Sequence, residues 1–315
     1  MGSKESSFFV IFMSIVLLIG LGFFILKDFP LVKSAEGEEN LSIIEMSINN
    51  GLNSLILNSN NTKKVECKAL VENFGQGGDQ QIQNIKAYFY DSENSFYNQS
   101  NDLNYHYSNL SCNLNNSFSK WQGYENTENN ILVECGFSVE YFANPGSWNC
   151  YIYAENSRGE NISSEENVNI REILAVSIPE SIDYGDLNAT EVSNEQVMDI
   201  ENTGNVEIDL NLYAYAQNYS DGIAMNCSKG IKNISLEYER YNITKSNNGS
   251  MNLSEFQSKY KAVSSNEVLE EINLDYRKND SVTEAINPLY WRLYVPEGVA
   301  GACQGNLGIS AVRSE

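Results

Sequence analysis

Histidine is almost absent from this chain, which has only His106 among its 315 residues. A serine nucleophile activated by a histidine base would therefore depend on that one residue. Zinc sites are disfavoured for the same reason, and the six cysteines include no CxxC pair. The motifs GxGxxG, HExxH and the phosphate-binding P-loop are also missing, so nucleotide binding and zinc proteolysis have no support. We expect a protein that is not an enzyme and uses no cofactor.

Carboxylates are plentiful, but they are not arranged in a recognisable catalytic or metal-binding spacing. Pairs such as Glu270 with Glu271, or Asp183 with Asp186, could serve glycoside hydrolysis, yet we interpret them as solvated surface. Calcium is an alternative at Asp183, Asp186 and Asp199, although no DxDxDG loop is present. The prediction is therefore no catalytic residue and no metal ligand, with calcium left open.

Basic residues are scarce, since 20 Lys and Arg face 42 Asp and Glu, for a net charge of −22. This charge repels phosphate backbones and anionic lipid headgroups. It excludes nucleic acid as a partner and leaves envelope proteins or glycans as candidates. The sequence leaves the oligomeric state open.

The chain has one long hydrophobic run, Phe8–Leu26, with 19 residues and no charge. As a helix it would be roughly 28 Å long, close to the thickness of a bilayer's hydrocarbon core. The sequence therefore predicts a single transmembrane anchor over 1–32, followed by a short stalk over 33–40. A cleaved secretory signal is the alternative, but its best cleavage residue, Ala35, has Lys33 where a small residue is expected.

Two features place the rest of the chain outside the cytoplasm, in a single-pass cell-membrane protein with an extracellular body. An even number of cysteines follows the hydrophobic run, as expected for disulfides in an oxidising compartment. Fourteen Asn-x-Ser/Thr sequons also occur, where composition predicts roughly six. The candidate glycosylation sites are Asn40, Asn60, Asn98, Asn109, Asn115, Asn161, Asn188, Asn218, Asn226, Asn233, Asn242, Asn248, Asn252 and Asn279.

Sequence context suggests how the cysteines pair. Cys112 and Cys135 lie in neighbouring strand-like runs that can lie side by side. The other two in the first half each lie within an apolar strand pattern, KVECKALVEN and SWNCYIYAE, as expected for a bond between two sheets of a sandwich. The last two are alone in the second half. The predicted bonds are Cys112–Cys135, Cys67–Cys150 and Cys227–Cys303.

Short runs rich in β-branched and aromatic residues, separated by Asn, Gly, Ser and Asp, predict an all-β body. The pattern restarts near Arg171, which divides the body into domains over 41–172 and 173–315. In VEIDLNLYAY, alternation places Val206, Ile208, Leu210 and Leu212 on one face. One short helix is expected within Asn252–Ser264. The runs LAVSI (174–178) and IDYGDL (182–187) are expected to be strands.

Three segments resemble immunoglobulin-like β-sandwich modules of prokaryotic, especially archaeal, cell-surface and envelope proteins. They are PGSWNCYIYAENSRGE (145–160), IENTGNVEIDLNLYAY (200–215) and YWRLYVPEGVAGACQGNLGISAV (290–312). In the second, Gly204 is expected to supply the positive φ of a hairpin turn. The resemblance implies two tandem sandwiches and a surface role, and it carries no binding or catalytic residues.

The leading functional hypothesis is a membrane-anchored structural or interaction protein of the cell envelope, associated for example with a surface layer. A ligand-binding adhesin or receptor-like module is one alternative, and an aromatic cluster on its loops would favour it. A pilin-like filament subunit is the other. Tyrosines suit contact surfaces, although strand packing explains many of them equally well, among them Tyr88, Tyr90, Tyr105, Tyr107, Tyr151, Tyr153, Tyr213 and Tyr215.

Overall fold

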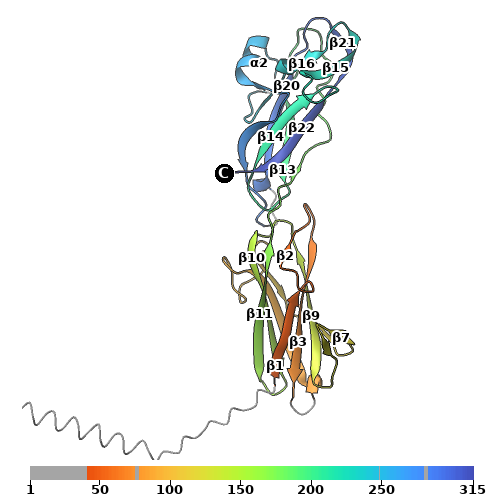
Figure 1. Ribbon diagram of the computed structural model, residues 1–315. Coiled ribbons are helices and arrows are strands. Elements are labelled where there is room, and N and C mark those ends of the chain that lie inside the picture. Colours follow the sequence, from red (N-terminus) through yellow and green to blue (C-terminus); the bar gives the residue numbers. More distant parts are fainter. Residues whose placement is uncertain (1–40, 75–77, 248, 280–282) are drawn as a thin grey trace, which may run out of the picture. The chain divides into compact units, whose positions relative to one another are not determined.

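The computed structural model describes residues 41–74, 78–247, 249–279 and 283–315, and they form an all-β structure. The first eleven strands build a sandwich of two sheets and a small hairpin (Figure 1). One sheet has the order β1 (Leu41–Ile48), β3 (Lys63–Asn73), β9 (Asn130–Val139), β6 (Asn113–Asn115). The other has the order β2 (Ser54–Leu55), β11 (Asn161–Ile170), β10 (Gly146–Asn156), β4 (Ile82–Asp91), β5 (His106–Asn109). The hairpin is β7 (Lys120–Trp121) with β8 (Tyr124–Glu125).

The remaining strands form the second sandwich. Its five-stranded sheet has the order β12 (Val176–Ser177), β13 (Gln196–Asn202), β20 (Ile286–Leu293), β17 (Glu239–Asn242), β18 (Lys261–Ala262). A three-stranded sheet faces it, in the order β19 (Val268–Leu274), β14 (Ile208–Tyr215), β22 (Asn306–Arg313). A further sheet has the order β16 (Ile234–Ser235), β15 (Ile223–Gly230), β21 (Val299–Gln304). Three short 3-10 turns complete the fold: η1 (Gly78–Gln81), η2 (Leu236–Tyr238) and η3 (Thr283–Ala285).

The structure corrects the predicted fold class in one respect. The expected membrane helix, Phe8–Leu26, lies outside the described residues, as do the anchor over 1–32 and the stalk over 33–40. Among the residues that are described, no helix is long and apolar enough to cross a bilayer. The α-helix present there, α2 (Leu253–Lys259), has seven residues and a length of about 10 Å. The corrected fold class, for the part of the chain that the structure describes, is all-β.

One strand prediction in the second half is confirmed in part, and another was wrong. Of the run 174–178 only β12 is paired, and the run 182–187 forms no strand. Instead, Ile182 and Tyr184 from this run pack against the core of the second sandwich. Their apolar side chains are needed for the core, but Gly185 at φ 73° breaks the extended conformation between them and the following residues.

The short helix and the alternating strand are confirmed. The side chain of Asn252 accepts a hydrogen bond from the Glu255 backbone N–H and so caps α2, while Phe256 on the same helix is completely buried. In β14, Ile208 and Leu210 are also completely buried, as their spacing predicts. Both elements therefore serve packing.

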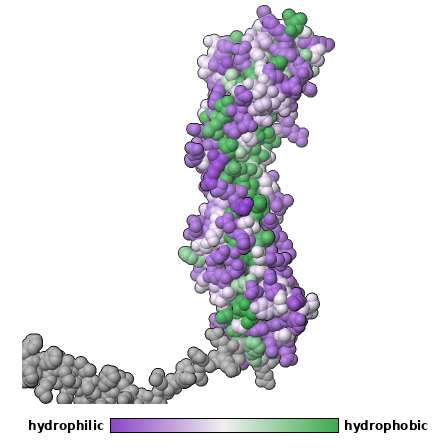
Figure 2. Space-filling view, in the orientation of Figure 1, coloured by the Kyte–Doolittle hydropathy of each residue, from purple (hydrophilic) through white to green (hydrophobic). Residues whose placement is uncertain are grey.

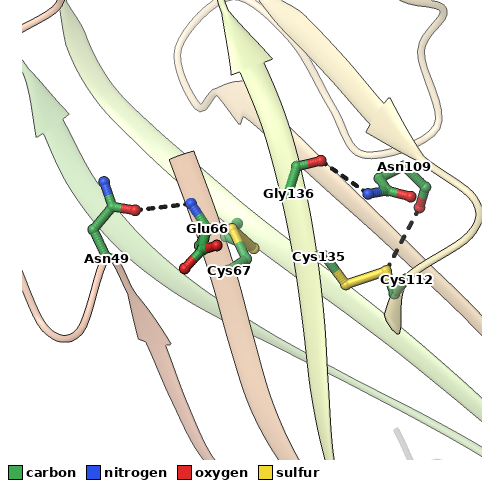
Figure 3. Close-up of a disulfide and its surroundings, with 8 residues drawn as sticks. Asn49, Glu66, Cys67, Asn109, Cys112, Cys135 and Gly136 are labelled. Carbon is green, nitrogen blue, oxygen red and sulfur yellow. Dashed lines mark hydrogen bonds between the residues drawn. A yellow bond between two sulfur atoms is a disulfide. The ribbon is translucent and has the colours of Figure 1, made fainter. Parts of the chain in front are cut away.

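All three predicted disulfides are present, and in the described residues no cysteine is free. Cys67 on β3 is bonded to Cys150 on β10, so this bond joins the two sheets through the core. Cys112 is bonded to Cys135 beside the β6–β9 pairing (Figure 3). Fully bonded cysteines indicate that the protein folds in an oxidising compartment.

The first sandwich has immunoglobulin-like features. A disulfide joins its two sheets through the core, as in antibody domains, and a buried tryptophan lies close to it. This residue, Trp148, lies two residues before Cys150, is completely buried, and donates its indole N–H to the Asn144 carbonyl at 2.8 Å. The resemblance to immunoglobulin-like sandwiches is therefore confirmed at the level of the fold.

The NTGN segment does not form the expected hairpin, because β13 and β14 belong to different sheets. Gly204 has no positive φ. Glycine is needed there for another reason, since a Cβ would lie 2.0 Å from the Ile173 carbonyl oxygen. The neighbouring Asn205 is buried and accepts from the Ile173 N–H at 2.7 Å while donating to the carbonyl of Arg171 at 3.2 Å. The segment therefore holds the chain that connects the two sandwiches.

Candidate interaction surface

Tyrosines gather on the outer face of the first sandwich because two neighbouring strands alternate in the same phase. In β4, Ala87 and Phe89 point into the core, so Tyr88 points outward. In β10, Ile152 points inward, so Tyr151 points outward. The strand register places Tyr151 directly opposite Tyr88. Neither tyrosine is buried.

A third ring comes from the loop between β4 and β5. Tyr97 stacks on Tyr151 with ring centroids 4.3 Å apart and an angle of 11° between the planes. Tyr88 lies 6.2 Å from Tyr151 and 6.3 Å from Tyr97, so each ring contacts the other two. Tyr97 is 44% exposed and its neighbour Phe96 is 64% exposed. We call Tyr88, Phe96, Tyr97 and Tyr151 the aromatic surface.

The sequence pointed to Tyr88 and Tyr151 as contact candidates but missed Phe96 and Tyr97. Their loop carries no periodic pattern that would have indicated a folded position. By contrast, Tyr107 is 3% exposed and belongs to the core of the first sandwich, whereas Tyr90 is 6% exposed but lies on the same outer face of β4 as Tyr88. Alternation along a strand distinguishes inward from outward tyrosines, whereas only the tertiary structure brings the loop with Phe96 and Tyr97 onto the sheet.

Polar side chains border the aromatic surface. Glu165 on β11 accepts from the Tyr90 hydroxyl at 3.0 Å and from the Asn149 amide at 2.6 Å. Burial raises the pKa of Tyr90 to about 12, so its hydroxyl is a neutral donor in the physiological range. The Tyr153 hydroxyl donates to Glu155 at 3.0 Å, and its pKa is raised mainly by desolvation. The border thus supplies carboxylate acceptors beside the rings.

His106 supports this surface from below. Its imidazole is completely buried, with ring centroids 5.8 Å from Tyr88 and 6.2 Å from Tyr90. Burial lowers the pKa of His106, so the neutral form is favoured. A histidine enclosed in this way packs against the tyrosines and lies out of reach of a substrate.

A second group of rings lies on the second sandwich. Tyr213 and Tyr215 of β14 stack at 6.1 Å, and Tyr219 meets Tyr213 edge to face at 5.2 Å. Gly308 on β22 lies under the Tyr213 ring, since a Cβ there would be 2.1 Å from a ring carbon. These rings cover the sheet backbone, and the fold brings Tyr219 to them from the loop after β14.

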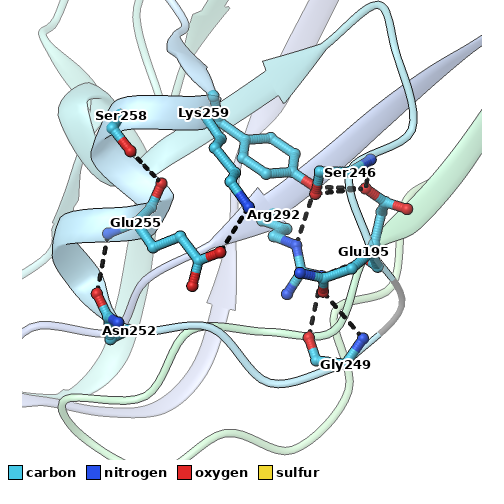
Figure 4. Close-up of polar contacts among 10 residues, drawn as sticks. Glu195, Ser246, Gly249, Asn252, Glu255, Ser258, Lys259 and Arg292 are labelled. Atoms are coloured by element: carbon cyan, nitrogen blue, oxygen red, sulfur yellow. Dashed lines mark hydrogen bonds and ion pairs between the residues drawn. The ribbon is translucent and has the colours of Figure 1, made fainter.

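One buried charged residue of the second sandwich is Arg292, which is completely enclosed (Figure 4). Its Nε donates to the Tyr260 hydroxyl at 3.0 Å, and Nη1 donates to the Ser193 carbonyl at 2.6 Å. Nη2 donates to the carbonyls of Asn247 and Gly249 at 2.7 and 3.1 Å. Because protein groups use the guanidinium on every side, Arg292 fixes the loop before α2 and is not available to a ligand.

The acidic candidates are dispersed. Asp183 and Asp186 line a cavity of 580 Å³ that does not include Asp199. Glu270 and Glu271 are consecutive on β19, so their side chains point to opposite faces. In the part of the chain that the structure describes, no three His, Cys, Asp or Glu side chains are grouped to hold a metal ion.

The described sequon asparagines are exposed or half-buried, and none lies in the core. Asn40 and Asn248 lie outside the described residues. Some side chains are already engaged, such as Asn252 at the start of α2 and Asn188, which donates to Glu191 at 3.0 Å. Glycosylation of these sites stays a prediction.

Comparison with known proteins yields similarity to solved structures alone. No family model and no curated protein matches the chain. The native conformation of E. coli alpha-2-macroglobulin matches 88% of this chain at 10% identity and a TM-score of 0.28, and the match spans 17% of that protein. A mutant of the enterotoxigenic E. coli adhesin CfaE matches 86% of this chain and 82% of its own, at 11% identity and a TM-score of 0.28. The C-terminal domain of the Streptococcus agalactiae polypeptide BspA matches 87% and 99%, at 9% identity and a TM-score of 0.22.

Proposed function

We propose that this protein is an extracytoplasmic binding module, of the adhesin or receptor-like kind, that contacts its partner through the aromatic surface of the first sandwich. The observation that carries the proposal is the stack of Tyr97 on Tyr151, which holds a loop ring and the neighbouring Phe96 exposed to solvent. Rigid tyrosines lose little conformational entropy on binding, and they tolerate both water and burial. Exposed aromatic rings in a fixed arrangement are characteristic of contact surfaces.

Two further features support this proposal. The three disulfides suit a protein that works in an oxidising compartment. The net charge of −22 disfavours nucleic acid and anionic lipid as the contacted partner. A neutral or basic surface of an envelope protein, or a glycan, fits the rings and their bordering carboxylates. Phe96, which is 64% exposed next to Tyr97 in the chain, favours a contact role over a purely structural one.

Site-specific cross-linking on intact cells tests the proposal. A photoreactive phenylalanine analogue placed at Tyr97 should form adducts, identified by mass spectrometry, that the same group at Ile231 does not form. Ile231 is a matched control because it is 89% exposed on the other sandwich. Replacing Tyr151 by alanine should remove the adducts at position 97, because the loop ring loses its stacking partner.

The same adducts from both positions would show that contact is nonspecific and would contradict the proposal. Unfolding of the Tyr151→Ala variant should be measured alongside. Tyr151 is half-buried, so we expect a loss of about 1 kcal/mol, too small to unfold the domain.

A further inference from the structure

Part of one sheet in the first sandwich corresponds to the three-stranded sheet of the second. In the first, β4 lies between β5 and β10, and β11 then pairs with the far side of β10 along ten residues. In the second, β14 lies between β19 and β22 in the same way. In the described residues, however, no strand pairs with the far side of β22. The position that β11 occupies in the first sandwich therefore has no equivalent in the second.

The free side of β22 presents unpaired backbone groups. The Ser314 N–H donates to the Glu207 carbonyl at 3.2 Å, so these two residues form a hydrogen-bonded pair of the ladder between β14 and β22. Hydrogen-bonded and non-hydrogen-bonded pairs alternate from there along both strands. Alternation in an antiparallel ladder then directs the N–H and C=O groups of Leu307, Ile309 and Ala311 away from β14. A further strand could pair with these three residues.

The side chains of the same residues are incompletely covered. Leu307, Ile309 and Ala311 pack against the core of the second sandwich but remain half-buried. The inward residues of the corresponding strand β10 are all completely buried, namely Trp148, Cys150, Ile152 and Ala154. Figure 2 shows hydrophobic residues exposed in a band on one face of the second sandwich. An added strand with inward apolar side chains would complete this core.

Protection against edge pairing is present at the other edges and weak at β22. The edge strands β1, β19 and β21 each contain a register shift, and the remaining edge strands have four residues or fewer. Such irregular or short edges discourage pairing with another chain. β22 pairs along eight residues without a shift, and its sequence, NLGISAVR, contains neither Lys nor Pro. A long, regular edge without such features is a template for pairing with another chain.

We propose that β22 accepts an extended segment of a different protein as an additional strand of the three-stranded sheet. This interaction is separate from the proposed function, because it uses the other sandwich. The segment would place apolar residues at alternate positions toward Leu307 and Ile309, and backbone hydrogen bonds would supply most of its affinity.

Charge decides the kind of partner. On the three strands themselves Asp209 is buried and Glu270 forms an ion pair with Lys261 at 2.6 Å, so the charge that a partner meets is set mainly by the chain as a whole. A second copy of the chain would bring another net charge of −22, which repels the first. The bound segment therefore carries lysine or arginine at its outward positions, and it belongs to a basic partner.

The test uses the whole protein and a synthetic peptide of eleven residues, with valine at alternate positions and lysine or threonine between them. Hydrogen exchange followed by mass spectrometry should show about tenfold slower exchange in 306–313 when the peptide is bound. A matched peptide, N-methylated on the backbone nitrogens of one edge, should give no protection, because it cannot complete the ladder.

A variant of the protein provides a second test. Ala311→Pro removes an N–H that points away from β14, so it should weaken peptide binding about tenfold while keeping the existing ladder. Ser310→Ala should bind the peptide as the unchanged protein does. If Ala311→Pro does not fold, the comparison of the two peptides on the unchanged protein still decides the outcome.

Three results would overturn the proposal. One is the absence of slower exchange in 306–313 at millimolar peptide. Another is equal protection by the N-methylated peptide, which would mean that backbone pairing is not involved. The third is self-association of the protein that protects 306–313 without any peptide, because the occupant would then be a second copy.

Discussion

Glu239 is a carboxylic acid whose protonation is set by burial. It is 6% exposed on β17, and its Oε1 accepts from the Tyr184 hydroxyl at 3.0 Å. Desolvation raises its pKa from 4.5 to about 7, although the hydrogen bond from Tyr184 opposes this. The folded state therefore binds this proton more tightly than the unfolded state does.

The stabilising contribution of protonated Glu239 is complete below pH 4.5 and is lost as the pH rises through 7. Glu239→Gln stays neutral and still accepts from Tyr184, so at pH 8 we expect the variant to be more stable by about 3 kcal/mol. At pH 4.5 the two proteins should be equally stable. Urea unfolding at both pH values measures the difference.

The comparison with the Glu239→Gln variant is needed because the protonation of His106 changes the stability of the fold with pH in the opposite direction. The pKa of His106 is lowered by burial, so its contribution is complete above its usual pKa of 6.5 and is lost as the pH falls. It is the same in both proteins and cancels. A difference between Glu239→Gln and the unchanged protein that does not vary with pH would contradict the prediction.

At the scale of elements, the disulfides join strands at different distances along the chain. Cys67 and Cys150 are 83 residues apart and connect two sheets, whereas Cys112 and Cys135 are 23 residues apart. In the chain-entropy model, the longer loop loses more freedom in the unfolded state. The first bond should therefore stabilise the fold more than the second.

Replacing each pair by alanine tests this order. We expect a loss of about 4.5 kcal/mol for Cys67 with Cys150, and about 3.5 kcal/mol for Cys112 with Cys135. Urea unfolding of both double variants gives the two free energies, and the shorter loop serves as the matched control. A larger loss from the Cys112 and Cys135 pair would show that loop length does not govern their contributions.

At the scale of the whole molecule, the net charge of −22 opposes the folded state through repulsion between carboxylates. Dissolved salt screens this repulsion over about 10 Å at 0.1 M and over shorter distances at higher concentration. Raising NaCl from about 20 to about 500 mM near pH 7.5 should therefore raise the midpoint of thermal unfolding, followed by circular dichroism, by about 5 °C.

The control is the same salt series near the isoelectric point, at about pH 4.4. There the net charge is close to zero, so the midpoint should change little. A midpoint at the higher pH that is insensitive to salt would mean that the negative charges are too far apart, or too well paired, to destabilise the fold.

Much of the first sandwich was predictable from local sequence. Alternation in runs such as ILVECGFSV and SWNCYIYAEN identifies strands, because a pleated chain exposes successive residues to opposite faces. The same reasoning gave a wrong strand prediction for 182–187, because Ile182 and Tyr184 pack on the core without strand pairing. A local sequence pattern therefore predicts which residues are buried more reliably than it predicts which residues pair in a strand.

The sequence by itself determined the all-β class, the oxidising compartment and the inward face of the strand that includes Ile208 and Leu210, because these depend on neighbouring residues and composition. Tertiary structure decided what depends on distant residues. Cys67 lies directly opposite Cys135 across β3 and β9, yet each bonds a different cysteine. Likewise, Tyr97 reaches Tyr151 only because a loop folds back over the sheet, and the edge of β22 is free only because no described strand lies beside it. Such juxtapositions are set by pairing across many residues, which no local pattern encodes.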